Sequence, residues 1–199
     1  MRYLFILILL CLGIYCIKHV FFKPPTPPNT APQFALPDPV AFKLKIFKGN
    51  EPENVEVYLL HANRWRMERV QLDTPGTHVT VFDGSRFVST DSDVTDTVGP
   101  APMLQTAMSS LNTMKPVSSG LQDGHQCWLY KVPMGMAGTT WDLWIDQDTN
   151  LPVFASGLTS GVYTEEHFQF LKSDFNVLEK TCFDSSATPV PMLTPFLTF

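Results

Sequence analysis

Residues 126–155 read QCWLYKVPMGMAGTTWDLWIDQDTNLPVFA, and this stretch decides the fold of the chain. It contains three apolar runs separated by turn-forming residues: Cys127–Val132, Thr140–Asp146 and Val153–Ala155. In the middle run, the side chains of Trp141, Leu143 and Ile145 recur at every second position, which is the period of a β-strand. The stretch therefore predicts a three-stranded meander with a wide apolar face.

The sequence upstream of this meander predicts further antiparallel strands. Five runs have the composition or alternation of strands: Ala41–Phe47, Val55–His61, Arg64–Leu72, His78–Phe82 and Arg86–Thr90. Turn signals such as Pro75-Gly76 and Asp83-Gly84 separate them. The connections are too short for crossover helices, so neighbouring strands are expected to run antiparallel. Downstream of the meander, Gly161–Phe170 and Asn176–Cys182 are additional strand candidates.

One helix is predicted, over Pro102–Met114. A proline near the first turn suits a helix start. The apolar residues of this segment share one helical face: Met103, Leu104, Ala107, Met108, Leu111 and Met114. The fold class is therefore mainly β (α+β), with a sheet whose one face a single short helix can cover only in part.

The composition divides the chain into four segments: the apolar residues 1–22, a proline-rich linker at 23–40, a β domain at 41–184 and a tail at 185–199. The length of 199 residues leaves room for one domain of about 150 residues. The linker is expected to be extended and semi-rigid. The tail is expected to be mobile, although its apolar side chains are able to dock on another surface.

The N-terminal segment has two interpretations. Read as a whole, Tyr3–Phe22 is just long enough to span a bilayer, which favours an uncleaved signal anchor with the domain in a periplasm, secretory lumen or extracellular space. Read as Tyr3–Ile17 alone, it has the length of a signal-peptide core. We favour the anchor because no small-residue cleavage site follows.

Two cysteines lie in the predicted domain, Cys127 and Cys182. In an exported protein these two residues are expected to form a disulfide, and the alternative is a pair of buried free thiols. No metal site is predicted, because histidines do not lie near this pair at ligand spacing.

Several function classes are excluded by composition and motif. A net charge of -5 gives no basic surface for nucleic acid. The sequence contains no nucleophile elbow, phosphate loop, dinucleotide fingerprint or zinc-protease motif, so we expect neither an enzyme nor a cofactor. The stretch from Asp146 to Asn150 resembles the start of a calcium loop but lacks its glycine and final acid, and it is interpreted as a hairpin turn.

The order of these motifs resembles the LolA/LppX-like superfamily of lipoprotein- and lipid-carrier domains. The matching features are Trp65-Arg66 in one strand, Asp83-Gly84 after another, the predicted helix, the Trp-rich strand ending in Asp146, and the following turn with Thr149 and Leu151-Pro152. The resemblance covers about Ala41 to Cys182. It consists of turns and aromatic residues and contains no catalytic signature.

The resemblance implies a single curved antiparallel sheet, a half-open barrel, with one or a few helices on its concave face and an acyl-binding gap between them. The residues expected to line this hydrophobic cavity are Trp65, Met67, Met103, Met108, Leu111, Trp128, Tyr130, Trp141 and Leu143. The alternative is that the same residues form a filled core.

Arg66 has two interpretations. The resemblance implies a contact from this residue to helix carbonyl groups across the cavity mouth, holding a lid closed. Strand alternation instead places Arg66 on the face opposite Trp65 and Met67.

The function expected from the resemblance is non-enzymatic binding or transport of a lipid or lipoprotein acyl chain by a membrane-anchored, exported domain. The alternative is a structural or sensory domain of the same fold, with a filled core, that binds a protein partner at an edge strand.

Overall fold

The computed structural model describes residues 33–90, 100–133, 139–159, 161–171, 183 and 188–199. The chain consists of two compact units, Met1–Ala31 and Pro32–Phe199, and all described residues belong to the second. The predicted membrane segment Tyr3–Phe22 lies outside them, as does the predicted strand Asn176–Cys182. Within the described part, no helix is both long enough and apolar enough to span a bilayer.

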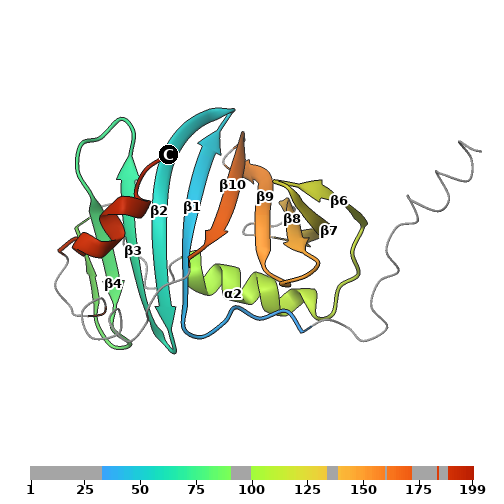
Figure 1. Cartoon of the computed structure of the whole chain (residues 1–199), viewed down its shortest axis with the longest axis horizontal. Helices are drawn as coiled ribbons and strands as arrows, with labels where there is room; N and C mark the ends of the chain where they lie inside the picture. The colour runs from blue at the N-terminus through green and yellow to red at the C-terminus, as the bar shows by residue number, and fades with distance from the viewer. Residues whose placement is uncertain (1–32, 91–99, 134–138, 160, 172–182, 184–187) are drawn as a thin grey trace, which may run out of the picture. The chain divides into compact units, whose positions relative to one another are not determined.

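In the described residues of this unit, ten antiparallel strands form one open, curved sheet (Figure 1). They are β1 (Val40–Lys48), β2 (Glu51–His61), β3 (Arg64–Gln71), β4 (His78–Phe82), β5 (Phe87–Ser89), β6 (Ser118–Gln122), β7 (His125–Pro133), β8 (Thr140–Asp146), β9 (Pro152–Thr159) and β10 (Val162–Phe170). Their order is β5-β4-β3-β2-β1-β10-β9-β8-β7-β6, so β5 and β6 are the edges. The predicted fold class, a mainly β chain with one curved and unclosed antiparallel sheet, is confirmed.

The pairing of β1 with β10 joins the two halves of the sheet. β1 to β5 form one meander and β6 to β10 form the other. The register places Leu44 opposite Phe168 and Ile46 opposite Glu166. The ends of the predicted domain therefore meet at its centre, which makes the apolar surfaces of the two meanders continuous.

Local turn chemistry explains two of the hairpins. Asp123 and Gly124 have φ values of 49° and 83°, the left-handed pair that a two-residue hairpin between β6 and β7 requires. After β8, Asp146 Oδ1 accepts hydrogen bonds from the backbone N–H groups of Asp148 and Thr149 at 2.9 and 2.7 Å. Asp146 thus organises the predicted turn before β9 and is buried, although strand alternation alone would place it in water.

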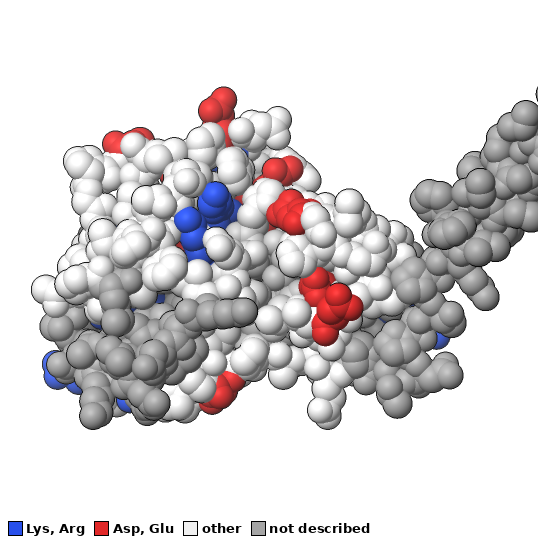
Figure 2. All heavy atoms as spheres, viewed as in Figure 1, with Lys and Arg blue, Asp and Glu red and all other residues white. Residues whose placement is uncertain are grey.

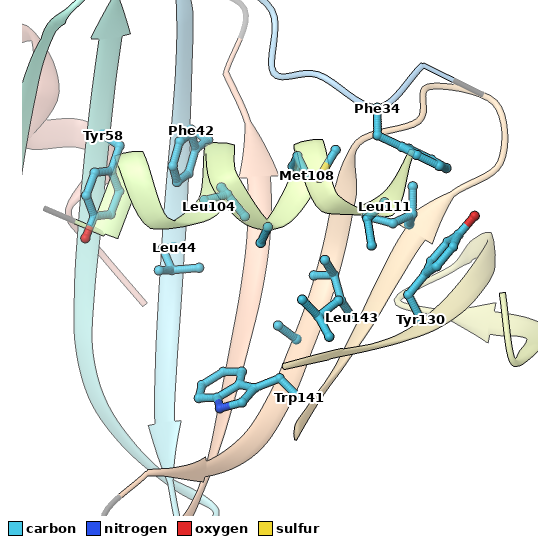
Figure 3. Packing of buried hydrophobic residues seen from close by; sticks show 14 of the residues in the cluster. Phe34, Phe42, Leu44, Tyr58, Leu104, Met108, Leu111, Tyr130, Trp141 and Leu143 are labelled. Carbon is cyan, nitrogen blue, oxygen red and sulfur yellow. The ribbon is translucent and has the colours of Figure 1, made fainter. Parts of the chain in front are cut away.

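The helix α2 (Pro100–Leu111) lies across one face of the sheet, here called the inner face (Figures 1 and 3). It begins two residues before the predicted helix and ends three residues earlier. The buried cluster on this face includes α2 residues together with alternating residues of β1, β7 and β8, and with Tyr58 of β2 and Trp65 and Met67 of β3. This cluster is the main core of the domain.

The opposite, outer face carries a second and smaller core. Ala41, Val57 and Leu59 pack there with Phe183 and with Leu193 and Leu197 of the C-terminal segment. This segment contains a 3-10 helix, η1 (Pro191–Phe196), which the sequence did not predict. Its apolar side chains are docked in the structure, as the sequence allowed. Both faces of β1 and β2 are therefore buried, one by α2 and the other by residues 188–199.

Candidate ligand-binding face

The site expected for a ligand is the inner face beneath α2. Leu104, Ala107, Met108 and Leu111 of α2 are each no more than 9% exposed and belong to the inner-face cluster. Figure 3 shows the helix running across several strands, with its apolar side chains directed toward residues of the sheet such as Leu143. The helix thus covers the middle of this face.

The sequence of α2 explains how it can cover the sheet without charged contacts. PAPMLQTAMSSL contains no acidic residue in its first turn and no basic residue in its last. Ser109 and Ser110 donate hydrogen bonds back to the carbonyl groups of Gln105 and Ala107, at 2.8 and 2.7 Å. Because such back-bonds satisfy the hydroxyl groups within the helix, hydrophobic burial is the main force that attaches this helix to the sheet.

The structure brings most of the predicted cavity residues together in the inner-face cluster. Those described with side chains are each buried there: Trp65, Met67, Met108, Leu111, Trp128, Tyr130, Trp141 and Leu143. The side chain of Met103 lies outside the described part. These residues pack against one another, so this state of the inner face is closed. The ligand-lining role of these residues stays a prediction.

A glycine of β9 shapes the floor of this face. A Cβ atom at Gly157 would lie 2.6 Å from Cγ, Cδ1 and Nε1 of Trp141, so the indole ring lies directly against the glycine backbone. Leu143, two residues further along β8, is opposite Ala155 in the same way. Small residues on β9 therefore give the large side chains of β8 room to lie against the sheet.

The C-terminal end of α2 is held by the segment that precedes β1. Asn112 Oδ1 accepts a hydrogen bond from the Phe34 N–H at 2.7 Å, and Asn112 Nδ2 donates to the Phe34 carbonyl at 3.2 Å. The Phe34 ring packs edge-on against Tyr130, with the ring centroids 5.4 Å apart. This contact, here called the Asn112 clasp, ties the end of the proline-rich linker to the helix that covers the inner face.

A polar group lies on the same face beside the apolar cluster. The Tyr58 hydroxyl donates to Glu56 and lies 3.2 Å from Met67 Sδ. Burial raises the pKa of Glu56 above its ordinary value, although the Tyr58 hydrogen bond and Arg69 oppose the shift. Across β1, burial and the neighbouring Glu56 raise the pKa of Glu166 to about 7. Two carboxyl groups are thus kept on a largely apolar face.

Arg66 lies on the outer face, away from α2, as strand alternation required. Its Nε and Nη2 atoms are each 2.8 Å from Glu68 Oε1, and both side chains are at most 1% exposed. Arg66 also donates to the Thr188 carbonyl, and Glu68 accepts a hydrogen bond from the Val190 N–H at 2.8 Å. In this structure, Arg66 therefore holds the C-terminal segment. The contact to helix carbonyl groups that the resemblance implies would require Arg66 on the inner face.

The cysteines and the candidate metal ligands lie only partly within the described residues. Cys127 is buried and has no disulfide partner among the described residues, and Cys182 lies outside them, so the pairing of the two stays a prediction. In the described ranges, no group of three or more His, Cys, Asp or Glu side chains is placed to hold a metal ion. On the face seen in Figure 2, charged side chains form small separate groups on a mostly uncharged surface.

Sequence reasoning missed the polar side chains that organise this face. The sequence patterns place Glu56 and Glu166 in strands without indicating a role for either, although alternation with Tyr58 and with Phe168 indicates their side of the sheet. The Asn112 clasp joins residues 78 positions apart and has no local signal. The long-range register of β1 with β10 was needed to place Glu166 beside Ile46.

Comparison with known proteins gives structural similarities only. The sequence matches no protein-family model and no curated protein. Among solved structures, MucB in complex with MucA(peri) is similar at 13% identity and a TM-score of 0.42, covering 68% of this chain and 52% of that one. MucB alone is similar at 13% identity and a TM-score of 0.43, covering 73% and 57%. This chain thus spans little more than half the length of the MucB chains.

A LolA superfamily protein from Nitrosomonas europaea is also similar, at 11% identity and a TM-score of 0.31, covering 75% of this chain and 93% of that one. At sequence identities and TM-scores this low, the ligand or partner of a similar protein is not assigned to this chain. The open antiparallel sheet and the helix packed on its inner face are instead seen directly in the strand order and in the position of α2.

Proposed function

We propose that this domain binds a lipid, or the acyl chain of a lipoprotein, on the inner face of the sheet beneath α2, and that it does so outside the cytoplasm on an N-terminal membrane anchor. The observation that carries the proposal is the attachment of α2: an apolar, charge-free helix covers the middle of the apolar inner face. Release of that helix exposes a continuous surface for an apolar chain.

The energies of closure and binding are of similar size. Three large α2 side chains, Leu104, Met108 and Leu111, are buried, and burial of each contributes about 1.5–3 kcal/mol. An acyl chain gains about 0.8 kcal/mol for each methylene removed from water. A chain of about ten methylenes therefore offsets the displacement of α2. Methionine side chains at Met67 and Met108 suit a face that repacks around different chains.

A fluorescent acyl probe tests this proposal on the full chain held in an amphipathic polymer. Wild-type protein is expected to bind the probe in a saturable manner. Ala107→Trp fills space beneath α2 and is expected to abolish binding, because Ala107 is 6% exposed within the cluster. Ser109→Trp is the matched control, since Ser109 is exposed on the same helix, and it is expected to bind like wild type.

Two results would contradict acyl binding beneath α2. The first is wild-type protein that neither binds the probe nor retains lipid in native mass spectrometry. The second is an Ala107→Trp variant that is folded, judged by its thermal unfolding, and binds the probe as well as Ser109→Trp does.

A second candidate function is protein binding at the β6 edge of the sheet. β6 is an end strand, and two apolar side chains in and beside it, Leu121 and Val117, are 72% and 59% exposed. A strand from a partner can add to such an edge. A photo-crosslinking residue at position 121, in native membranes, is expected to give one discrete product that a crosslinker at the exposed Leu72 does not give. Identical patterns at both positions would contradict an edge-specific partner.

A further inference from the structure

The strand register places three hydrogen-bond acceptors around one residue of the inner face. Ile46 of β1 lies opposite Asn54 of β2 on one side and opposite Glu166 of β10 on the other. Glu56 is two residues from Asn54 on the same strand and therefore points to the same side of the sheet. The three side chains thus surround Ile46 on the face that α2 covers.

One of these acceptors is buried with no protein donor. Asn54 is 6% exposed, and its Oδ1 atom has no hydrogen-bond partner in the described structure. A buried amide oxygen without a donor costs about 1–3 kcal/mol, so such an atom marks a place where a donor is missing. Glu166 remains partly exposed, which leaves this place accessible from the inner face.

The acceptor group adjoins the apolar surface beneath α2. Glu166 is opposite Ala155 of β9, and Ala155 is in turn opposite Leu143 of β8. Ala155 and Leu143 both belong to the inner-face cluster. Ala155 on β9 is two strand spacings, or about 10 Å, from Ile46 on β1. The polar end of a chain that lies under the helix can therefore reach Ile46.

The charges at this place favour a cationic donor. Two carboxyl groups, Glu56 and Glu166, repel each other, and Arg69 offsets Glu56 in part. Tyr58 already donates to Glu56. A primary ammonium group supplies three donors and one positive charge, which matches two carboxylates and one amide oxygen.

We propose that Glu166, Glu56 and Asn54 bind the primary ammonium headgroup of an amphipathic ligand whose chain lies beneath α2. This inference rests on the proposed function, because it assigns the polar end of the same ligand. It names aminated lipids and other long-chain amines as the preferred ligand class. Neutral and anionic lipids of equal chain length are bound less tightly.

Displacement of the fluorescent acyl probe by dodecylamine and by dodecanol tests the proposal with the full chain. At pH 8 the amine is protonated, since the pKa of an alkylammonium group is about 10.4. Glu166 is mostly ionised at this pH, because its pKa is about 7. From wild-type protein, dodecylamine is expected to displace the probe at about tenfold lower concentration than dodecanol does. This ratio corresponds to the net free energy of one set of hydrogen bonds to a charged group. Glu166→Gln is expected to reduce that preference to about twofold or less.

Glu165→Gln is the matched control, because Glu165 is the neighbouring residue on β10 and points to the outer face. It is expected to keep the wild-type preference. Asn54→Ala is a second variant, and its preference for the amine is expected to fall. This substitution removes Oδ1, which accepts no hydrogen bond in the described structure.

The outcomes separate this inference from the proposed function. Displacement by both ligands at equal concentrations contradicts the ammonium site and leaves acyl binding supported. Failure of both ligands to displace the probe contradicts acyl binding beneath α2 and the headgroup site with it. An equal loss of preference in Glu165→Gln and Glu166→Gln contradicts the assignment to the inner face.

Discussion

The buried ion pair on the outer face makes the strongest prediction about stability. Glu68→Met replaces a carboxylate that is 0% exposed by an apolar side chain of similar length and leaves the Arg66 guanidinium buried beside it. The hydrogen bond from Arg66 to the Thr188 carbonyl remains in this variant. The substitution is therefore expected to destabilise the domain strongly and to release residues 188–199 from the sheet.

The magnitude follows from the bonds of one oxygen atom. Glu68 Oε1 accepts from Arg66 Nε, from Arg66 Nη2 and from the Val190 N–H, each at 2.8 Å. Removing one partner of such a buried pair costs about 3–5 kcal/mol, because a charge remains in an environment of low dielectric constant. That loss is a large share of a typical stability of about 5–15 kcal/mol. The double variant Arg66→Met/Glu68→Met leaves no buried charge and is expected within about 1 kcal/mol of wild type.

Urea unfolding of the full chain, followed by tryptophan fluorescence, measures these differences, and limited proteolysis reports on the C-terminal segment. Glu68→Met is expected to lower the urea midpoint and to expose the region around η1 to protease. The Lys131–Asp142 pair at 2.6 Å is a suitable control, since it is solvent-exposed and its loss is expected to cost less than about 1 kcal/mol. A Glu68→Met variant as stable as wild type, or a double variant less stable than the single, would refute the reasoning.

Three further predictions concern the inner face. Gly157→Ala places a methyl group 2.6 Å from the Trp141 ring and is expected to cost about 1–3 kcal/mol in urea unfolding; an unchanged midpoint would contradict the close packing. Since the pKa of Glu166 is raised from 4.5 to about 7, its stabilising contribution is complete below about pH 4.5 and lost as the pH rises through 7. Glu166→Gln should therefore flatten thermal stability between these pH values, and an unchanged slope would contradict the shift. Asn112→Ala breaks both bonds to Phe34 and is expected to accelerate binding of the acyl probe; an unchanged rate would show that the Asn112 clasp does not limit opening.

The strands and hairpins of the sheet were predictable because short, local sequence patterns specify them. Alternation in β8 and turn residues such as Asp123-Gly124 specify strands and hairpins over a few residues. The helix was predictable from its apolar period, within two or three residues at each end. The pairing of β1 with β10 was not, since residues more than 100 positions apart form it and no alternation pattern names a distant partner.

The candidate site was predictable only in its apolar part. Alternation identified Trp141 and Leu143 as inward-facing, and both are in the inner-face cluster. The same rule failed for β1 and β2, where both faces are buried because residues 188–199 dock on the outer one. Arg66 shows the consequence: its side chain is buried, but by the C-terminal segment, whose docking no local pattern indicates.

The state of Cys127 requires an assay that does not depend on native reactivity. Burial, with Asp146 and Asp123 nearby, raises the pKa of the Cys127 thiol to about 11, so a free thiol here is almost entirely protonated at pH 8 and reacts slowly with alkylating reagents. Slow labelling of the folded chain is therefore expected with or without a disulfide. Alkylation after denaturation without reductant separates the two cases, because unfolding removes the burial that protects the thiol. If Cys127 is bridged to Cys182 as the sequence predicts, peptide mapping finds neither alkylated until a reductant is added. Alkylation of both before reduction would contradict the bridge and leave Cys127 as a buried thiol.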